Sequence, residues 1–389
     1  MATTTSSLPR SIPRSPTTSL CRNPAAPWRH VDVILVSCLV AVASLGVLMV
    51  YSATRGPGGD QPLDDTFLTR QAVFVLAGFA VMFAVSLIDY RNFREWAIVI
   101  YGGFVLLLVL VVSPLGSEKK GAQAWFQLGS FQLQPSEFAK LAVIIGLSAL
   151  AAQFQGEIDL RRLATCMVVA GIPLTLIMVQ PDLGTGLVLA VISAGILLLA
   201  GARPRHMAAM GLCSVLGAGL LLNSNVLEEY QKARLTSFLD PAAELQTEAY
   251  NRNQSIIAIG AGSWFGAGLF EGTQTRLRNV PEQHTDFIFT AVGEELGFVG
   301  AGTLLALFGI MCWRVWRTAQ LARDSFGTLV CVGVLVMLLF QIFQNVGMTM
   351  GIMPITGIPL PFVSYGGSSV VTMFAGVGIV LNVHMRRFA

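Results

Sequence analysis

The stretch VDVILVSCLVAVASLGVLMVY, residues 31–51, is an apolar run with a single charge near its start. A helix of about 20 apolar residues crosses the hydrocarbon core of a bilayer, whereas the apolar part of a secretory signal peptide has about 7–15. The run therefore predicts a membrane span, and similar runs recur along the chain. We expect an all-α polytopic membrane protein with about ten spans, near residues 31–52, 68–88, 96–114, 138–152, 163–179, 184–200, 207–223, 286–313, 326–350 and 360–383.

The composition supports this fold class. Hydrophobic residues make up 54% of the 389 residues and charged residues only 12%, whereas soluble proteins have about 25% charged residues. The net charge of +3 is spread along the chain without a basic stripe, so nucleic acid is excluded as a partner. The six cysteines form no CxxC pair, which argues against a zinc site and against structural disulfides.

The arginines predict the orientation. Positive residues in short loops mark the cytoplasmic side of a membrane protein, and here most of the arginines fall on one side of the predicted spans. We therefore place both termini in the cytoplasm, with residues 1–30 as a disordered tail and residues 31–389 as the transmembrane domain. The arginines on that side are Arg10, Arg14, Arg22, Arg29, Arg91, Arg94, Arg161, Arg162, Arg203, Arg205, Arg314, Arg317, Arg323, Arg386 and Arg387.

A large outer loop, residues 224–285, follows the seventh predicted span. Within it, QSIIAIGAGSWFGAGLF (residues 254–270) is apolar enough for another span. Counting it would move the later arginines outside, so we expect a re-entrant or interfacial segment. Nonhelical backbone at membrane depth must be buried in protein or line a wet cavity.

Asp286 lies in PEQHTDFIF, residues 281–289, where the outer loop enters the eighth predicted span. It can cap the helix, because an Asp side chain accepts hydrogen bonds from the free N–H groups of a helix N-terminus. It can also act at the membrane surface as a base that takes a proton from a lipid-attached substrate. The residues alone leave both interpretations open.

Glu137 and Lys140 lie in QPSEFAK, residues 134–140, at the outer start of the fourth predicted span. A spacing of three places them on one helix face, where they can pair. Ionisable residues in a span are costly and are functional candidates, so the pair either neutralises itself or leaves Lys140 to meet an anion such as phosphate. Asp182, in the next outer turn, is either a helix cap or part of the same outer cavity.

Other polar residues fall on the outer side or within the spans. Arg276 and Arg278 are cations that suit a pyrophosphate, although exposed charges often only face solvent. The Pro- and Gly-rich residues 353–369 form either a plain connection or an inward loop that presents Ser364 and Ser368. His284, alone outside, makes a poor metal site. We expect Glu294 and Glu295, which helical periodicity turns away from Asp286, to bond neighbouring spans.

Several long motifs resemble the SEDS family (shape, elongation, division and sporulation proteins) from about residue 31 to the C-terminus. Two motifs, EGTQ and FLDP, are more similar to the RodA branch, which serves elongation, than to the FtsW branch of division. The motifs are GAQAWFQLGSFQLQPSEFAK (121–140), QPDLGTG (180–186), FLDP (238–241), EGTQ (271–274), PEQHTDFIF with GEELGFVG (281–300) and NVGMTMGIMPITGIPLPFVSYGGSS (345–369).

The resemblance implies a peptidoglycan glycosyltransferase of the bacterial cytoplasmic membrane. It implies that Asp286 is the catalytic carboxylate, that Glu137 and Lys140 are a functional pair, and that a class B penicillin-binding protein is the partner. The expected substrates are lipid II and the nascent glycan strand, held among membrane lipids. The sequence fixes no cofactor, but it leaves open a divalent cation, Mg or Mn, at the pyrophosphate.

Two other functions remain open from the residues. A lipid II flippase would need access from both sides and polar groups near the middle of the bilayer. Such groups are Glu294, Glu295, Gln341, Gln344 and Asn345. A noncatalytic scaffold would only activate its transpeptidase partner. The one-sided placement of the polar candidates and the lack of a clear inverted repeat favour the glycosyltransferase.

Overall fold

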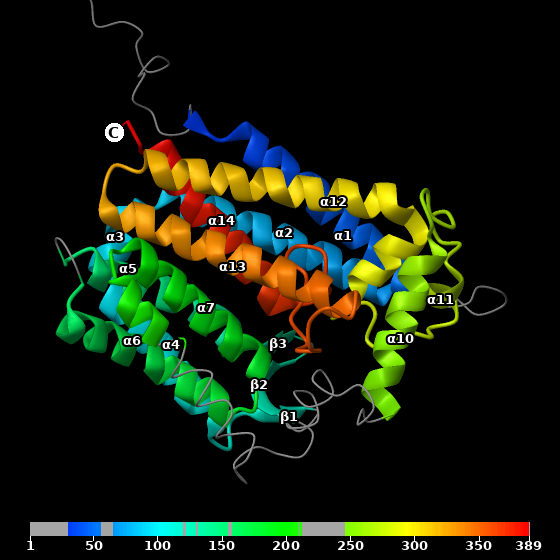
Figure 1. The fold of residues 1–389 in the computed structure, drawn as a ribbon, viewed down its shortest axis with the longest axis horizontal. Helices are drawn as coiled ribbons and strands as arrows, with labels where there is room; N and C mark the ends of the chain where they lie inside the picture. The colour runs from blue at the N-terminus through cyan, green and yellow to red at the C-terminus, as the bar shows by residue number, and fades with distance from the viewer. Residues whose placement is uncertain are drawn as a thin grey trace, which may run out of the picture.

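The structure, a computed structural model, describes residues 30–55, 65–119, 122–129, 131–154, 158–209, 211 and 246–388. The predicted tail up to residue 29, most of the predicted seventh span and residues 224–245 of the outer loop lie outside these ranges. Long helices dominate (Figure 1). The elements are α1 (Val33–Thr54), α2 (Thr66–Leu87), α3 (Tyr90–Glu95), α4 (Ala97–Val112), β1 (Ser117–Lys119), β2 (Ala122–Leu128), β3 (Phe131–Leu133), α5 (Pro135–Ala151), α6 (Leu160–Val179), α7 (Leu183–Leu199), α10 (Gln246–Ala261), α11 (Thr273–Arg276), α12 (Ile288–Leu321), α13 (Ser325–Thr349) and α14 (Gly367–Met385).

The predicted fold class, an all-α polytopic membrane protein, is confirmed. Within the described ranges, α1, α2, α6, α12, α13 and α14 are long and apolar enough to cross a membrane, and α4 and α7 are shorter apolar helices. Apart from residues 207–223, each predicted run contains one helix. The last helix begins at Gly367 instead of residue 360, because Pro359 and Pro361 disfavour a continuous helix there.

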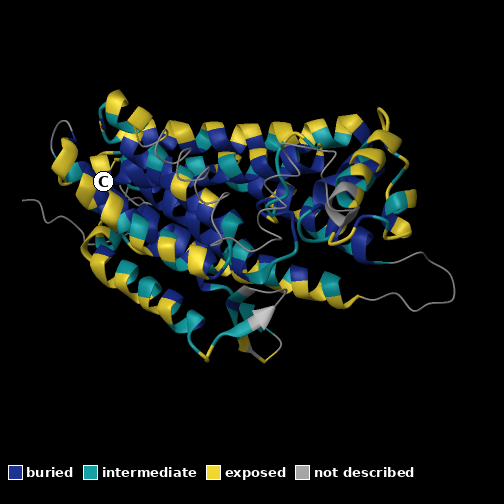
Figure 2. Cartoon of the chain, turned by 60° about the horizontal axis from the view of Figure 1, so that its bottom comes forward, coloured by how far each residue is buried: buried dark blue, intermediate teal, exposed yellow. Residues whose placement is uncertain are grey.

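The outward faces of the helices are apolar. Ile98 and Val99 at the start of α4 are 86% and 75% exposed, and Phe83 on α2 is 64% exposed. Figure 2 shows exposed residues in bands along the outer helices and buried residues between them. A water-soluble protein rarely exposes so much contiguous apolar surface, so these faces suit contact with lipid.

Helix α14 lies at the centre of the bundle, with nearly all of its residues buried. It packs closely on α2 through glycines. A Cβ atom at Gly78 would lie 2.4 Å from the ring of Phe374, and one at Gly378 would lie 2.8 Å from the carbonyl oxygen of Met82. Small residues allow such close approach between helices in a membrane, and these two contacts hold α14 against α2.

A small antiparallel sheet, in the order β1-β2-β3, occupies the predicted outer loop 114–137. The apolar runs in the sequence did not predict this sheet. Strand β2 pairs with β1 on one side and with β3 on the other. Strand β3 ends at Leu133, and Pro135 begins α5 two residues later. The sheet therefore fixes where α5 starts.

The apolar segment 254–270 consists of the end of α10 followed by irregular backbone. The irregular part covers a break in α12 at Gly297, whose φ of 64° interrupts the helix. The segment is not buried in protein, since Trp264 and Phe265 are 67% and 82% exposed, but its backbone is bonded to α12. Its re-entrant or interfacial placement stays a prediction. Four main-chain hydrogen bonds join the segment to α12: Ala267 N to Glu294 O (2.9 Å), Gly268 N to Glu295 O (3.2 Å), Phe298 N to Ser263 O (2.9 Å) and Val299 N to Trp264 O (3.1 Å).

Candidate active site

Asp286 lies in the turn between α11 and α12 and is partly exposed. The N-cap residue of α12 is Phe287, whose side chain makes no capping hydrogen bond. Asp286, one residue earlier, is therefore not the N-cap residue that one interpretation expected. Its carboxylate faces the loop before α14, because a Cβ atom at Gly357 would lie 3.3 Å from Asp286 Oδ2. Gly357 has a φ of +69°, which favours glycine at this close approach.

Two amides on the last turns of α13 fix that loop. Asn345 Nδ2 donates to the carbonyl oxygens of Asp286 (2.8 Å) and Ile358 (2.7 Å). Gln344 Nε2 donates to Pro354 O (2.9 Å) and to Thr356 Oγ1 (3.1 Å). Both amide side chains are fully buried. These hydrogen bonds hold the loop from Pro354 to Ile358 against the main chain at Asp286. They also give both buried amide nitrogens the partners that buried polar groups need.

Asp182 caps α7, as one interpretation predicted, since its Oδ1 accepts from Thr185 N at 3.0 Å. It also contacts the start of α5. Its Oδ2 accepts from Gln134 Nε2 at 3.2 Å and from Ser136 Oγ at 3.4 Å, both at the start of α5. Burial raises the pKa of Asp182 in this turn; nearby Glu137 also raises it, and the Thr185 hydrogen bonds and Lys140 act in the opposite direction.

The start of α7 also meets the loop before α14. A Cβ atom at Gly184 would lie 2.6 Å from Thr356 O, so only a glycine allows this contact without a shift of the loop. Thr356 thus lies between the α7 cap and Gly357. The contacts run without a gap from α5 through Asp182 and Thr356 to Asp286.

Glu137 and Lys140 form the predicted ion pair, with Glu137 Oε1 2.9 Å from Lys140 Nζ. Glu137 is 4% exposed and Lys140 is 1% exposed. A buried ion pair is costly to desolvate. This pair nevertheless occupies positions where most membrane helices carry apolar residues. That Lys140 meets an anion stays a prediction, because its ammonium group is enclosed.

The two predicted serines serve the local structure. Ser368 Oγ accepts from Gln134 N at 3.0 Å and donates to Gln132 O at 3.1 Å, which ties α14 to the end of the sheet. Ser364 Oγ accepts from Leu360 N at 2.8 Å within its own loop. Both serines are buried. Their expected contact with a substrate remains a prediction.

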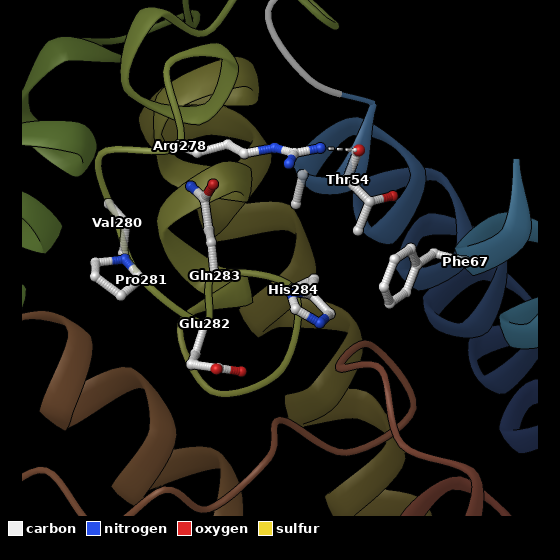
Figure 3. A pocket seen from close by; sticks show the side chains of 9 residues that line it. Thr54, Phe67, Arg278, Val280, Pro281, Glu282, Gln283 and His284 are labelled. Carbon is white, nitrogen blue, oxygen red and sulfur yellow. Dashed lines mark hydrogen bonds between the residues drawn. The ribbon is translucent and has the colours of Figure 1, made fainter. Parts of the chain in front are cut away.

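A pocket of about 210 Å³ opens beside the Asp286 turn. In Figure 3, Arg278 extends across it to Thr54 at the end of α1, and His284 faces Phe67 at the start of α2. Arg278 Nη2 donates to Thr54 O at 2.8 Å. The lining residues are Ala53, Thr54, Phe67, Arg278, Val280, Pro281, Glu282, Gln283 and His284.

The two predicted arginines therefore differ. Arg278 lines the pocket, whereas Arg276 is on the surface of α11 and pairs with Glu271 at 3.1 Å. The pocket connects to the Asp286 loop, because Tyr365 N donates to His284 O at 2.9 Å. Arg278 lines the same pocket as His284, which lies two residues before Asp286 in the chain.

Glu294 and Glu295 are buried in α12 and bond to structure, as expected, but only one of them reaches a neighbouring span. Glu295 accepts from Ser52 of α1 and from Phe270 N (3.2 Å). Glu294 instead accepts from the start of α11: from Gln274 N at 2.6 Å and from Thr275 N at 2.9 Å. A carboxylate at a helix N-terminus satisfies its free N–H groups, so Glu294 holds α11 in place.

The sequence missed three residues that build this site: Gln134, Asn345 as a loop clamp, and Thr356. Buried amides in apolar helices were the available signal, because such groups need partners. Within the described ranges, His, Cys, Asp and Glu side chains nowhere gather in a group of three that could hold a metal ion.

Residues 32–388 match the model of the FtsW/RodA/SpoVE family, described as cell cycle proteins. The chain is 37% identical over 358 residues to the stage V sporulation protein E of Bacillus subtilis, covering 90% of this chain and 96% of the relative. It is 35% identical to the peptidoglycan glycosyltransferase MrdB of Escherichia coli K12, covering 92% and 94%. The chain therefore belongs to this family, the one its motifs resemble.

Two solved structures share the fold. A chain of a peptidoglycan synthase complex, studied for the coordination of polymerization and crosslinking, aligns with a TM-score of 0.78 at 32% identity over 92% of this chain and 98% of that one. The rod shape determining protein RodA of Thermus thermophilus aligns with a TM-score of 0.70 at 30% identity over 94% and 100%.

Proposed function

We propose that this chain is a peptidoglycan glycosyltransferase that polymerises lipid II at the outer face of the bacterial cytoplasmic membrane. The observation that carries the proposal is the half-buried Asp286 carboxylate, held against Gly357 at one end of the bundle beside a cation-lined pocket. The activity named for the Escherichia coli relative supports it.

Asp286 acts as the general base. It takes the proton from the 4-hydroxyl of the acceptor GlcNAc, and that oxygen attacks the anomeric carbon of the growing chain. The bond to the lipid pyrophosphate breaks, and the pyrophosphate leaves with its electron pair. One displacement inverts the anomeric carbon and needs no covalent enzyme intermediate, so a single carboxylate suffices.

The leaving pyrophosphate needs positive charge. Arg278 supplies it in the pocket, and the buried Lys140 contributes from beneath Asp182. Ser364 and Ser368 shape the loop before α14 and the start of that helix, and Arg276 lies at the edge of the site on α11. A divalent ion, Mg or Mn, would draw on the pyrophosphate oxygens for ligands, since the described side chains provide no three-residue cluster.

The site and the arginine-rich ends lie at opposite ends of the bundle. In Figure 1 the start of α1 and the ends of α12 and α14 lie at one end, and α10, α11 and the sheet lie at the other. The positive-inside tendency assigns the first end to the cytoplasm, so both termini are cytoplasmic in this proposal and the Asp286 site faces outward.

A role in elongation and a class B penicillin-binding protein as partner complete the proposal. The elongation role draws support from the EGTQ motif and the RodA-like fold. The partner draws support from the related chain in a complex that couples polymerization with crosslinking. The flippase alternative is weakened, because Gln344 and Asn345 hold the site loop instead of lining a path.

The test is a polymerisation assay with the purified full chain. Lipid II is supplied with and without the cognate transpeptidase, and with Mg, Mn or a chelator, and the products are separated on a gel. A glycan ladder supports the proposal, and its loss in chelator would establish a metal requirement. The absence of a ladder in every condition would overturn the proposal and favour the flippase or scaffold.

A further inference from the structure

Gln341 of α13 is fully buried, and neither atom of its amide has a hydrogen-bond partner among the described residues. Thr372 of α14 is also fully buried with an unpartnered hydroxyl. Oε2 of Glu137, the oxygen that does not face Lys140, is the third such atom. Buried polar groups in native proteins have partners, in protein or in ordered water. Three unpartnered residues on three different helices therefore require an explanation.

Contacts around Gly376 place these residues together. A Cβ atom at Gly376 of α14 would touch Leu141 of α5 at 3.4 Å and Met337 of α13 at 3.5 Å. Residues four apart lie above one another on the same face of a helix. One helical turn outward, Thr372 therefore follows from Gly376, Glu137 from Leu141 and Gln341 from Met337.

Two further contacts fix the register. Ser368 of α14 bonds Gln134 of α5 at 3.0 Å, which places Thr372 beside Glu137 from the outer end. A Cβ atom at Gly333 of α13 would lie 2.8 Å from Ile144 of α5. Because α5 and α13 run in opposite directions, that contact brings Gln341 to the level of Glu137 from the inner end.

We propose that Gln341 and Thr372 are positioning residues for the Glu137–Lys140 ion pair and that ordered water links them to Glu137 Oε2. Water satisfies the three unpartnered residues at once, since it both donates and accepts. With both carboxylate oxygens bonded, Glu137 holds the Lys140 ammonium in one place. The charged groups around Glu137 are Lys140 on its own helix and Asp182 in the α6–α7 turn, whereas α4, α7, α13 and α14 present uncharged side chains there.

The test is the infrared spectrum of the full chain in lipid nanodiscs at one fixed pH. The carboxylate stretching band of Glu137 is identified by its loss in Glu137→Gln. We expect Gln341→Leu and Thr372→Val each to shift this band, because the stretching frequency of a carboxylate changes when it loses a hydrogen-bond donor. Ser148→Ala is the matched control: Ser148 is a buried, unpartnered hydroxyl on α5, three turns inward of Glu137.

An unchanged band position in Gln341→Leu and Thr372→Val would overturn the inference, and so would an equal shift in Ser148→Ala. If Gln341→Leu does not fold, the unbranched Gln341→Met replaces it. The role in the reaction rests on the proposed function: in the polymerisation assay both variants should extend glycan more slowly than the wild type, and Ser148→Ala should not. An inactive wild type would end the proposed function, whereas the infrared result would still decide the inference.

Discussion

The side-chain amide of Asn345 donates a 2.8 Å hydrogen bond to the main-chain carbonyl of Asp286. The same nitrogen donates to Ile358 O at 2.7 Å, so one side chain on α13 joins the candidate base to the loop that covers it. The position of Asp286 therefore depends on a side chain from another helix.

Asn345→Leu should lower both stability and polymerisation. Two carbonyls lose their donor, and an unsatisfied buried polar group costs about 1–3 kcal/mol. The melting temperature and the rate of glycan extension measure the two effects. The control is Asn279→Leu, which removes an amide that bonds Gln274 in α11 at 2.8 Å, away from Asp286. Equal loss of polymerisation rate in both variants would contradict the positioning role.

Gly357→Ala should reduce the turnover rate more than it reduces stability. Its Cβ atom would lie 3.3 Å from Asp286 Oδ2 and displace the carboxylate. A small misplacement of a catalytic group lowers the rate on the order of 10- to 100-fold. Gly351→Ala introduces similar backbone strain at a φ of +74°, where the three atoms nearest the new methyl belong to the side chains of Arg252 and Ile256. We expect comparable melting temperatures for the two variants and slow turnover only for Gly357→Ala.

These relationships show what the sequence could predict. The helices around residues 31–51 and 326–350 followed from apolar length alone, because a span must satisfy its backbone internally in lipid. The Glu137–Lys140 pair followed from a spacing of three on one helix. Both depend only on residues close together in the chain.

The rest of the site depends on contacts between distant segments. Asn345 and Asp286 are 59 residues apart, and only the packing of α13 against α12 brings them together. The capping role expected as one option for Asp286 failed because α12 begins one residue later than that role requires. The sheet at residues 117–133 went unpredicted, because its short strands carry no apolar run of membrane length.

Breaking the buried ion pair should destabilise the protein more than removing it. Glu137→Gln leaves an unpaired buried lysine, and Lys140→Met leaves an unpaired carboxylate; such changes cost about 3–5 kcal/mol each. The double variant leaves no buried charge there and should melt above the less stable single variant. Strictly additive losses in a double-mutant cycle would show that the two side chains do not interact.

Glu294→Gln should affect stability and leave chemistry intact. Its carboxylate accepts from Gln274 N, Thr275 N and Thr275 Oγ1 at 2.6–2.9 Å. Hydrogen bonds to charged groups contribute about 1.5–3 kcal/mol, so the melting temperature should fall while the folded fraction still polymerises. A normal melting temperature with complete loss of polymer would instead assign Glu294 to the reaction.

The most direct test is the rate of glycan extension by Asp286→Asn, with lipid II binding and melting temperature measured on the same sample. The control is Asp65→Asn, an exposed carboxylate before α2 that makes no side-chain cap hydrogen bond. The general-base role predicts a rate loss on the order of 10²–10⁴ in Asp286→Asn with binding and stability retained, and no loss in the control. A folded Asp286→Asn protein that binds lipid II and extends glycan at the wild-type rate would contradict the role assigned to Asp286.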